Sequence, residues 1–288
     1  MEMNNPMSNQ NGDAPENQAG ISPVKLSYKS KFVFECHPKV SCFTRCCRGI
    51  NIILTPYDII RLKNKLNLSS EDFLAIYTTP ELLEKTDLPV VTLKLLDDKE
   101  KSCPFVRENG CLVYEDRPTA CRYYPLGVGT LSYDSTADDK VDAEDGFFFF
   151  VHEPHCKGFE EKKEWTVAEW RKDQGVDIHD DINAEWTDLV VRKRSFPKNI
   201  ALTEKSKQMF FMASYDIDRF KRFVFDSSFL SLYPVDEATQ EKIKNDEIAL
   251  LQFGIKWLKW LLFKIGDFSM NEHLVKERAE KTKTTPNE

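Results

Sequence analysis

The sequence lacks the features that mark several common classes of protein. No stretch of about 20 residues is free of charged side chains, so no transmembrane helix is expected. The formal net charge is −7 and the basic residues are spread along the chain, which argues against a nucleic-acid partner. No Ser/His/Asp arrangement or pair of carboxylates can be picked out, so catalytic residues stay unassigned. Residues 127–129 read Gly-Val-Gly but lack the third glycine and the lysine of nucleotide loops, and we expect a turn there.

The first 20 residues are polar and lack the basic start and apolar core of a secretory signal. We therefore expect a cytoplasmic protein, in a compartment where thiols stay reduced. Residues 1–22 are rich in Asn, Gln, Pro and Gly, and residues 277–288 are similarly polar. Both tails are predicted to be disordered.

One apolar segment, residues 249–265, resembles a membrane span in composition. Gln252, Lys256 and Lys259 interrupt it at steps of four and three, which places them on one stripe of a helix. We expect an amphipathic helix packed on the core. A helix lying on a membrane surface is the alternative.

Cysteines are confined to the first part of the chain. They are Cys36, Cys42, Cys46, Cys47, Cys103, Cys111, Cys121 and Cys156. Disulfides are disfavoured because the chain is much longer than small disulfide-rich domains, and because the adjacent Cys46 and Cys47 could bridge only with strain. Thiolates favour zinc and iron–sulfur clusters, so we predict that these cysteines hold one or the other. Eight thiols could serve two sites, or one site with spares.

The pattern of apolar residues and helix caps predicts an α+β fold, with a small loop-rich cysteine domain of short helices and strands and a mostly helical C-terminal region. The predicted domains are residues 23–160 and 161–276. In the first, we expect helices over 56–66 and 70–77, strands over 90–96 and 147–151, and a hairpin turn at Asn109-Gly110. In the second, we expect helices over 166–173, from 181 or 183 to 194, over 203–215, from 216, and over 236–264.

Several short motifs recur together in one known family. They are Cys42-x-x-x-Cys46-Cys47, Cys103-Pro104-Phe105, Asn109-Gly110-Cys111-Leu112-Val113-Tyr114, Arg117-Pro118-Thr119-Ala120-Cys121-Arg122-Tyr123-Tyr124-Pro125 and His155-Cys156-Lys157-Gly158. This ordered combination resembles the YkgJ-type cysteine-cluster family, zinc- or iron-chelating proteins that include flagellin lysine N-methylase. The resemblance covers roughly residues 34–160.

The resemblance implies metal binding, and it suggests protein-lysine methylation with a protein substrate and S-adenosylmethionine as donor. Against this activity, the sequence has no glycine-rich loop of the Rossmann type. The alternative is a non-enzymatic module that is stapled by its metal or chelates it.

Charged and imidazole side chains near the cysteines are candidates for supporting roles. A guanidinium of Arg117 or Arg122 beside Cys121 would lower the pKa of the thiol, unless both arginines pair with Glu115 and Asp116. His37, His152 and His155 could be ligands. His155 could instead be a second-shell donor next to Cys156.

Overall fold

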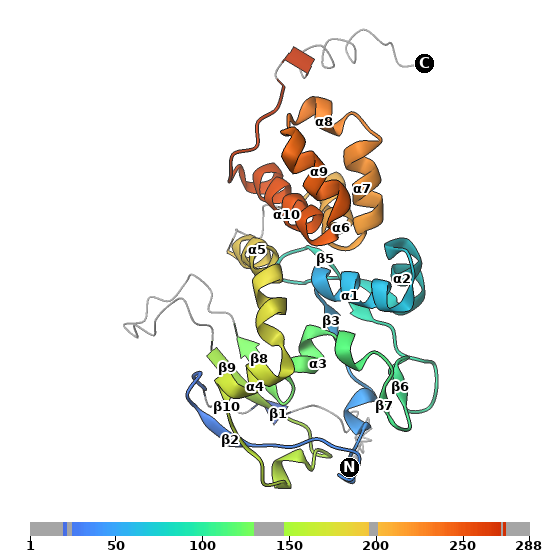
Figure 1. Cartoon of the computed structure of the whole chain (residues 1–288), viewed down its shortest axis with the longest axis vertical. Coiled ribbons are helices and arrows are strands. Elements are labelled where there is room, and N and C mark those ends of the chain that lie inside the picture. Colours follow the sequence, from blue (N-terminus) through green and yellow to red (C-terminus); the bar gives the residue numbers. More distant parts are fainter. Residues whose placement is uncertain (1–19, 22–24, 130–146, 196–200, 272, 275–288) are drawn as a thin grey trace, which may run out of the picture.

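The computed structural model describes residues 20–21, 25–129, 147–195, 201–271 and 273–274. It has short strands and helices in the first part and mostly helices from residue 167, so the predicted α+β class is confirmed. Figure 1 shows helices α6 to α10 gathered at one end of the molecule, the strands β1, β2, β8, β9 and β10 at the other, and β3, β5, α1 and α2 between them. The predicted disordered tails lie mostly outside the described residues, although Gly20–Ile21 forms strand β1.

A three-stranded antiparallel sheet lies in the middle of the molecule, with strand order β3 (Ile53–Leu54), β5 (Pro89–Leu93), β4 (Thr78–Leu82). Helix α1 (Pro56–Leu66) follows β3 and begins at Thr55, which forms a capping box with Asp58. Helix α2 (Ser70–Tyr77) begins at Ser69, whose side chain caps it. Both helices have the predicted ranges, whereas β5 begins one residue before the predicted strand of residues 90–96 and ends three residues before its end.

The second group of strands is formed by two separate sheets. One has the order β1, β9 (Phe147–His152), β8 (Leu126–Gly129), and the other pairs β2 (Lys31–Val33) with β10 (Glu164–Thr166). The turn predicted at residues 127–129 is wrong, because these residues form β8. A Cβ on Gly127 would lie 2.4 Å from the Phe149 ring, so glycine is needed there to let the phenylalanine of β9 lie across the strand.

The predicted hairpin is present as β6 (Val106–Arg107) and β7 (Gly110–Cys111). Arg107 pairs with Gly110, so the turn residues are Glu108 and Asn109, one position earlier than predicted. Gly110 belongs to β7 and has φ 122°, a conformation that favours glycine.

The remaining helices are α3 (Thr119–Tyr123), α4 (Val167–Gln174), α5 (Val176–Arg194), α6 (Glu204–Tyr215), α7 (Ile217–Phe225), α8 (Phe229–Leu232), α9 (Glu237–Asn245) and α10 (Glu247–Phe263), with the 3-10 turns η1 (Arg45–Cys47), η2 (Tyr114–Asp116) and η3 (Gly158–Glu160). Two helix predictions are wrong. Helix α5 begins right after Gly175, at φ 64°, rather than at 181 or 183. The helix predicted over 236–264 is broken at Asp246, whose carboxylate caps α10 by accepting from Ile248 N and Ala249 N.

Two apolar clusters hold the molecule together, and each contains residues from both sides of position 160. The larger joins Leu54 and Phe105 to Tyr215 and Trp257. The smaller packs Phe34 and other residues before position 150 against the residues of α4. The division of the chain into domains stays a prediction.

Helix α10 packs on the core, as the amphipathic pattern predicts, with Trp257 and Leu258 buried. Lys259 is buried as well, and its Nζ lies 2.5 Å from both Glu185 Oε2 and Asp188 Oδ2 of α5. Among the described residues, none of the helices has the length and apolar character needed to cross a bilayer.

Candidate metal centre

The first cysteines are tied by backbone hydrogen bonds to the segment that carries Cys103. The N–H of Cys103 donates to the carbonyl of Cys47 at 2.8 Å, and Arg48 forms a β-bridge with Ser102. Cys46 and Cys47 lie on the 3-10 turn η1. Residues 56 positions apart are therefore held side by side by the main chain.

Two further thiols, those of Cys111 and Cys121, lie beside this junction. Val106 pairs with Cys111 across the hairpin and donates its N–H to the carbonyl of Cys103 at 3.2 Å. Cys121 lies on α3, and its pKa is raised by burial and by the neighbouring thiols of Cys103, Cys46 and Cys111. Burial raises the pKa of Cys103 and of Cys111 as well.

The other thiols meet where residues 35–42 lie against residues 156–158. The backbone N–H of Lys157 donates to Cys42 Sγ at 3.1 Å. The pKa of Cys36 is raised to about 12 by burial and by the neighbouring thiols of Cys46, Cys42 and Cys156. This set therefore brings Cys36, Cys42 and Cys46, from one stretch of the sequence, close to Cys156 from another.

Cys46 connects the two sets. Its pKa is raised by a hydrogen bond with the Cys47 side chain and by burial. It acts electrostatically on Cys36 and Cys156 of one set and on Cys111 and Cys121 of the other. We call the eight cysteines together the thiol cluster, and all eight are free thiols.

The eight thiols are donors that suit soft metals, and the distances between their sulfurs help to distinguish zinc from an iron–sulfur cluster. Four sulfurs around one zinc, with bonds of about 2.3 Å, are about 3.8 Å apart. Over the ranges that the structure describes, which include every cysteine, no three Sγ atoms lie within 4.8 Å of one another. The thiols fit a zinc or iron–sulfur centre by chemistry, but they would have to move closer together to surround a single zinc ion.

The side chains of the two arginines in the motif donate to backbone carbonyls and to an amide oxygen, rather than to the carboxylates of Glu115 and Asp116. Arg117 donates to the carbonyl of Tyr114 at 2.7 Å and to Gln174 Oε1 at 2.5 Å. Arg122 donates to the carbonyls of Arg117, Gln174 and Glu115. The expected lowering of the Cys121 pKa is wrong, because burial and neighbouring thiols raise it. The charge of Arg117 does lower the pKa of Cys111, by less than burial raises it.

The three histidines differ in their surroundings. His155 directly precedes Cys156, and its Nε2 lies 2.9 Å from Glu153 Oε2. His152 stacks on the Phe159 ring with centroids 4.2 Å apart. His37 Nε2 faces Glu161 Oε2 at 3.6 Å. Metal ligation and second-shell roles for these side chains stay predictions.

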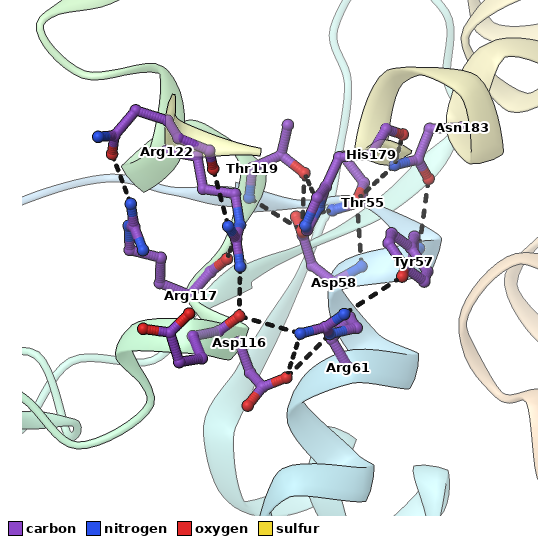
Figure 2. Close-up of polar contacts among 12 residues, drawn as sticks. Thr55, Tyr57, Asp58, Arg61, Asp116, Arg117, Thr119, Arg122, His179 and Asn183 are labelled. Atoms are coloured by element: carbon purple, nitrogen blue, oxygen red, sulfur yellow. Dashed lines mark hydrogen bonds and ion pairs between the residues drawn. The ribbon is translucent and has the colours of Figure 1, made fainter. Parts of the chain in front are cut away.

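A buried polar network that the sequence reasoning missed anchors the helix of Cys121 (Figure 2). Asp58, on α1, is fully buried, and its Oδ1 accepts from Thr119 N at 2.9 Å and from Thr119 Oγ1 at 2.7 Å. Its Oδ2 accepts from Thr55 N at 2.9 Å. His179 of α5 is also buried, with Nδ1 3.0 Å from Thr119 Oγ1. Thr119 stands inside the cysteine motif and could have been noticed, whereas the sequence carries no signal for His179.

The same network reaches α5 and the loop before α3. Asn183 Nδ2 donates to Thr55 Oγ1 at 3.1 Å, and Asn183 Oδ1 accepts from Tyr57 N at 3.2 Å. Arg61 donates to Asp116 Oδ1 at 2.9 Å and to the Glu115 carbonyl at 2.9 Å. Figure 2 shows these residues of α1, α3, α5 and the intervening loop converging on Asp58 and Arg61. The position of α3 is therefore set by side chains far from it in sequence.

Comparisons with known proteins agree with the motifs. A family model named CxxCxxCC and described as "Putative zinc- or iron-chelating domain" matches residues 35–157. Comparison with curated proteins and with solved structures gave no match. The matched segment contains the whole thiol cluster and the Asp58–Thr119 contact. Residues 35–157 of this chain, less than half of its length, thus match the cysteine-cluster family that the motifs resemble.

Proposed function

We propose that the protein binds zinc or iron through the thiolates of the thiol cluster. The observation that carries this proposal is the gathering of eight free thiols from separate stretches of the sequence, in a domain of a metal-chelating family. Burial and mutual repulsion disfavour the thiolate forms when no cation is present. A bound metal supplies the missing positive charge and takes the place of the thiol protons.

Between the two metals, the spacing supports iron in a cluster. An iron–sulfur cluster places several atoms between its thiolates, whereas a single zinc ion brings four sulfurs into direct contact with one atom. In the part of the chain that the structure describes, no three cysteine sulfurs lie within 4.8 Å of one another, as ligands of a single zinc ion would. Eight thiols in two connected sets provide donors for two centres.

The surrounding residues would position and screen the thiolates. Lys157 N–H donates to Cys42 Sγ, and hydrogen bonds to a ligand sulfur tune the electronic properties of a metal centre. Arg107 and Arg117 contribute positive charge near Cys111. Thr119 and Asp58 hold the helix of Cys121. A cluster of reduced thiols requires a reducing compartment, so a cytoplasmic location is part of the proposal.

The test is anaerobic purification followed by metal analysis, sulfide analysis and a visible absorption spectrum. A brown protein with iron and matching sulfide supports an iron–sulfur centre. A colourless protein with zinc supports chelation of zinc and removes the iron–sulfur version. A protein free of both metals, with eight titratable thiols, would contradict the proposal.

Lysine methylation is the enzymatic form that the family resemblance suggests, and no contact described above favours it over simple chelation. It requires S-adenosylmethionine and a protein substrate. Equilibrium binding of S-adenosylmethionine to the metal-loaded protein distinguishes the two forms: saturable binding supports an enzyme, and no binding at millimolar ligand supports a chelating module. The matched family description names metal chelation alone.

A further inference from the structure

A second group of metal-binding side chains lies next to the thiol cluster but contains no thiol. One ligand atom each from Glu35, His37 and Glu161 lies within 4.8 Å of the other two, and all three residues are half-buried. Glu35 and His37 are two positions apart, as in an extended segment where alternate side chains share a side. Cys36, between them, contributes its thiol to the set with Cys42. One short segment therefore lends residues to two distinct groups.

The main chain holds this group in place from both sides. The N–H of Phe34 donates to the carbonyl of Lys163 at 2.9 Å, and the N–H of Glu35 donates to the carbonyl of Gly158 at 3.0 Å. The first bond extends the β2–β10 pairing by one residue. The second ties Glu35 to the start of the 3-10 turn η3, and Glu161 directly follows this turn. A Cβ on Gly158 would lie 2.9 Å from the Glu35 carbonyl oxygen, so this close approach depends on glycine.

The donor atoms of the group favour a cation. Two acidic side chains and one imidazole bring oxygen and nitrogen donors to the same place. Two neighbouring lysines are engaged elsewhere: Lys157 pairs with Glu160 at 2.8 Å, and Lys163 Nζ lies 4.0 Å from the Trp165 ring centroid. Carboxylate oxygens with one imidazole suit divalent ions harder than those that thiolates select.

We propose that Glu35, His37 and Glu161 form a second metal site, distinct from the thiol cluster, for a divalent cation such as Mn²⁺ or Fe²⁺. The N–H of Lys39 donates to His37 Nδ1 at 3.2 Å, which places the proton of the neutral ring on Nε2, toward Glu161. A cation bound at Nε2 takes the place of that proton, and the ring then carries its proton on Nδ1. The Lys39 hydrogen bond is lost in this exchange, so we expect moderate affinity. Three protein ligands leave coordination positions open for water or a substrate.

Manganese separates this site from the thiols because Mn²⁺ prefers oxygen and nitrogen donors. Mn²⁺ is titrated into the anaerobically purified full-length protein, and free Mn²⁺ is measured by electron paramagnetic resonance. We expect one saturable site whose dissociation constant rises at least ~10-fold in Glu35→Gln, His37→Gln and Glu161→Gln.

The matched control is Glu160→Gln, which removes an adjacent carboxylate that pairs with Lys157 instead. Its Mn²⁺ affinity should equal that of the unmodified protein. Circular dichroism and the content of thiol-bound metal verify that each variant is folded, and any one folded variant suffices to test the site. Absence of Mn²⁺ binding up to millimolar concentration, or binding that the three substitutions leave unchanged, would overturn the proposal.

Discussion

The carboxylate of Asp58 and the backbone N–H of Thr119 are joined by a hydrogen bond of 2.9 Å across 61 positions of sequence. Asp58 belongs to α1, and Thr119 is the first residue of α3. Cys121 lies two residues further along the same short helix. This contact therefore links a buried carboxylate to the placement of a proposed metal ligand.

Replacing Asp58 with Asn should destabilise the protein and reduce its metal content. The amide puts an N–H₂ donor where two oxygens now accept from Thr55 and Thr119, so one buried donor loses its partner. We expect a loss of about 2–4 kcal/mol in the free energy of unfolding, measured by urea denaturation. Displacement of α3 should also lower the ratio of bound metal to protein.

Asp72→Asn is the control for this substitution. Asp72 is an exposed acid in the first turn of α2, where it accepts from Ser69 Oγ. A surface change of this kind should alter stability by no more than about 0.5 kcal/mol. Equal losses in the two variants, or full metal content in Asp58→Asn, would contradict a positioning role for Asp58.

Cys121→Ser tests the thiol ligands directly. The thiols of Cys103, Cys46 and Cys111 raise the pKa of Cys121, so they lie near it. The substitution therefore removes a sulfur from among the other thiols of the cluster. We expect the variant to bind markedly less zinc or iron, measured by metal analysis of protein purified without oxygen. Ala120→Ser places the same side chain on the exposed neighbouring position and should keep normal metal content. A folded Cys121→Ser protein with full metal occupancy would refute the assignment.

Metal removal should loosen one part of the molecule and spare another. Among residues 36–47, all of which the structure describes, Val40 is the only residue in the apolar core and the others keep more of their surface exposed, so this segment has little apolar packing of its own. Helix α10 is packed in the larger apolar cluster. With a chelator, hydrogen exchange measured by mass spectrometry should rise at least ~10-fold in residues 36–47 and stay unchanged in α10. Unchanged exchange in both segments would show that the metal does not order the cysteine loops.

Asp188 makes the stability of the helical part depend on pH. Burial raises its pKa, but hydrogen bonds from Arg192 and Lys259 outweigh that effect and lower the pKa below its ordinary value of 3.8. A lowered pKa in the folded state means that this stabilisation is present above the unfolded pKa and is lost as pH falls through the folded pKa.

We expect Asp188→Asn to have a lower free energy of unfolding than the unmodified protein at pH 6. This difference should shrink below pH 4. The carboxylate is partly exposed, so the difference should be about 1 kcal/mol or less. The measurement is urea denaturation of both proteins across this pH range. Any loss of metal at acid pH affects both proteins and so cancels in the difference. A difference that grows as the pH falls would contradict this account.

The local elements were largely predictable because their signals are contained in adjacent residues. Thr55, Pro56 and Asp58 form a cap within four positions, and the helix begins where they predict. The start of α5 and the break at Asp246 were missed. Helix α5 begins directly after Gly175, before the Asp181 and Asn183 that are predicted to start it. At Asp246 the helical pattern of the sequence continues, but the carboxylate caps a new helix and so ends the previous one.

The sequence by itself indicated the proposed thiolate chemistry, because its eight cysteines stand in an ordered set of motifs that match a zinc- or iron-chelating domain. The tertiary structure decided which thiols are neighbours, since that depends on hydrogen bonds such as Cys103 N–H to Cys47 O and Lys157 N–H to Cys42 Sγ. It also decided the roles of Asp58, His179 and Glu161. Their carboxylate and imidazole groups become significant only when strands and helices distant in sequence pack together, and spacing along the chain carries no record of that packing.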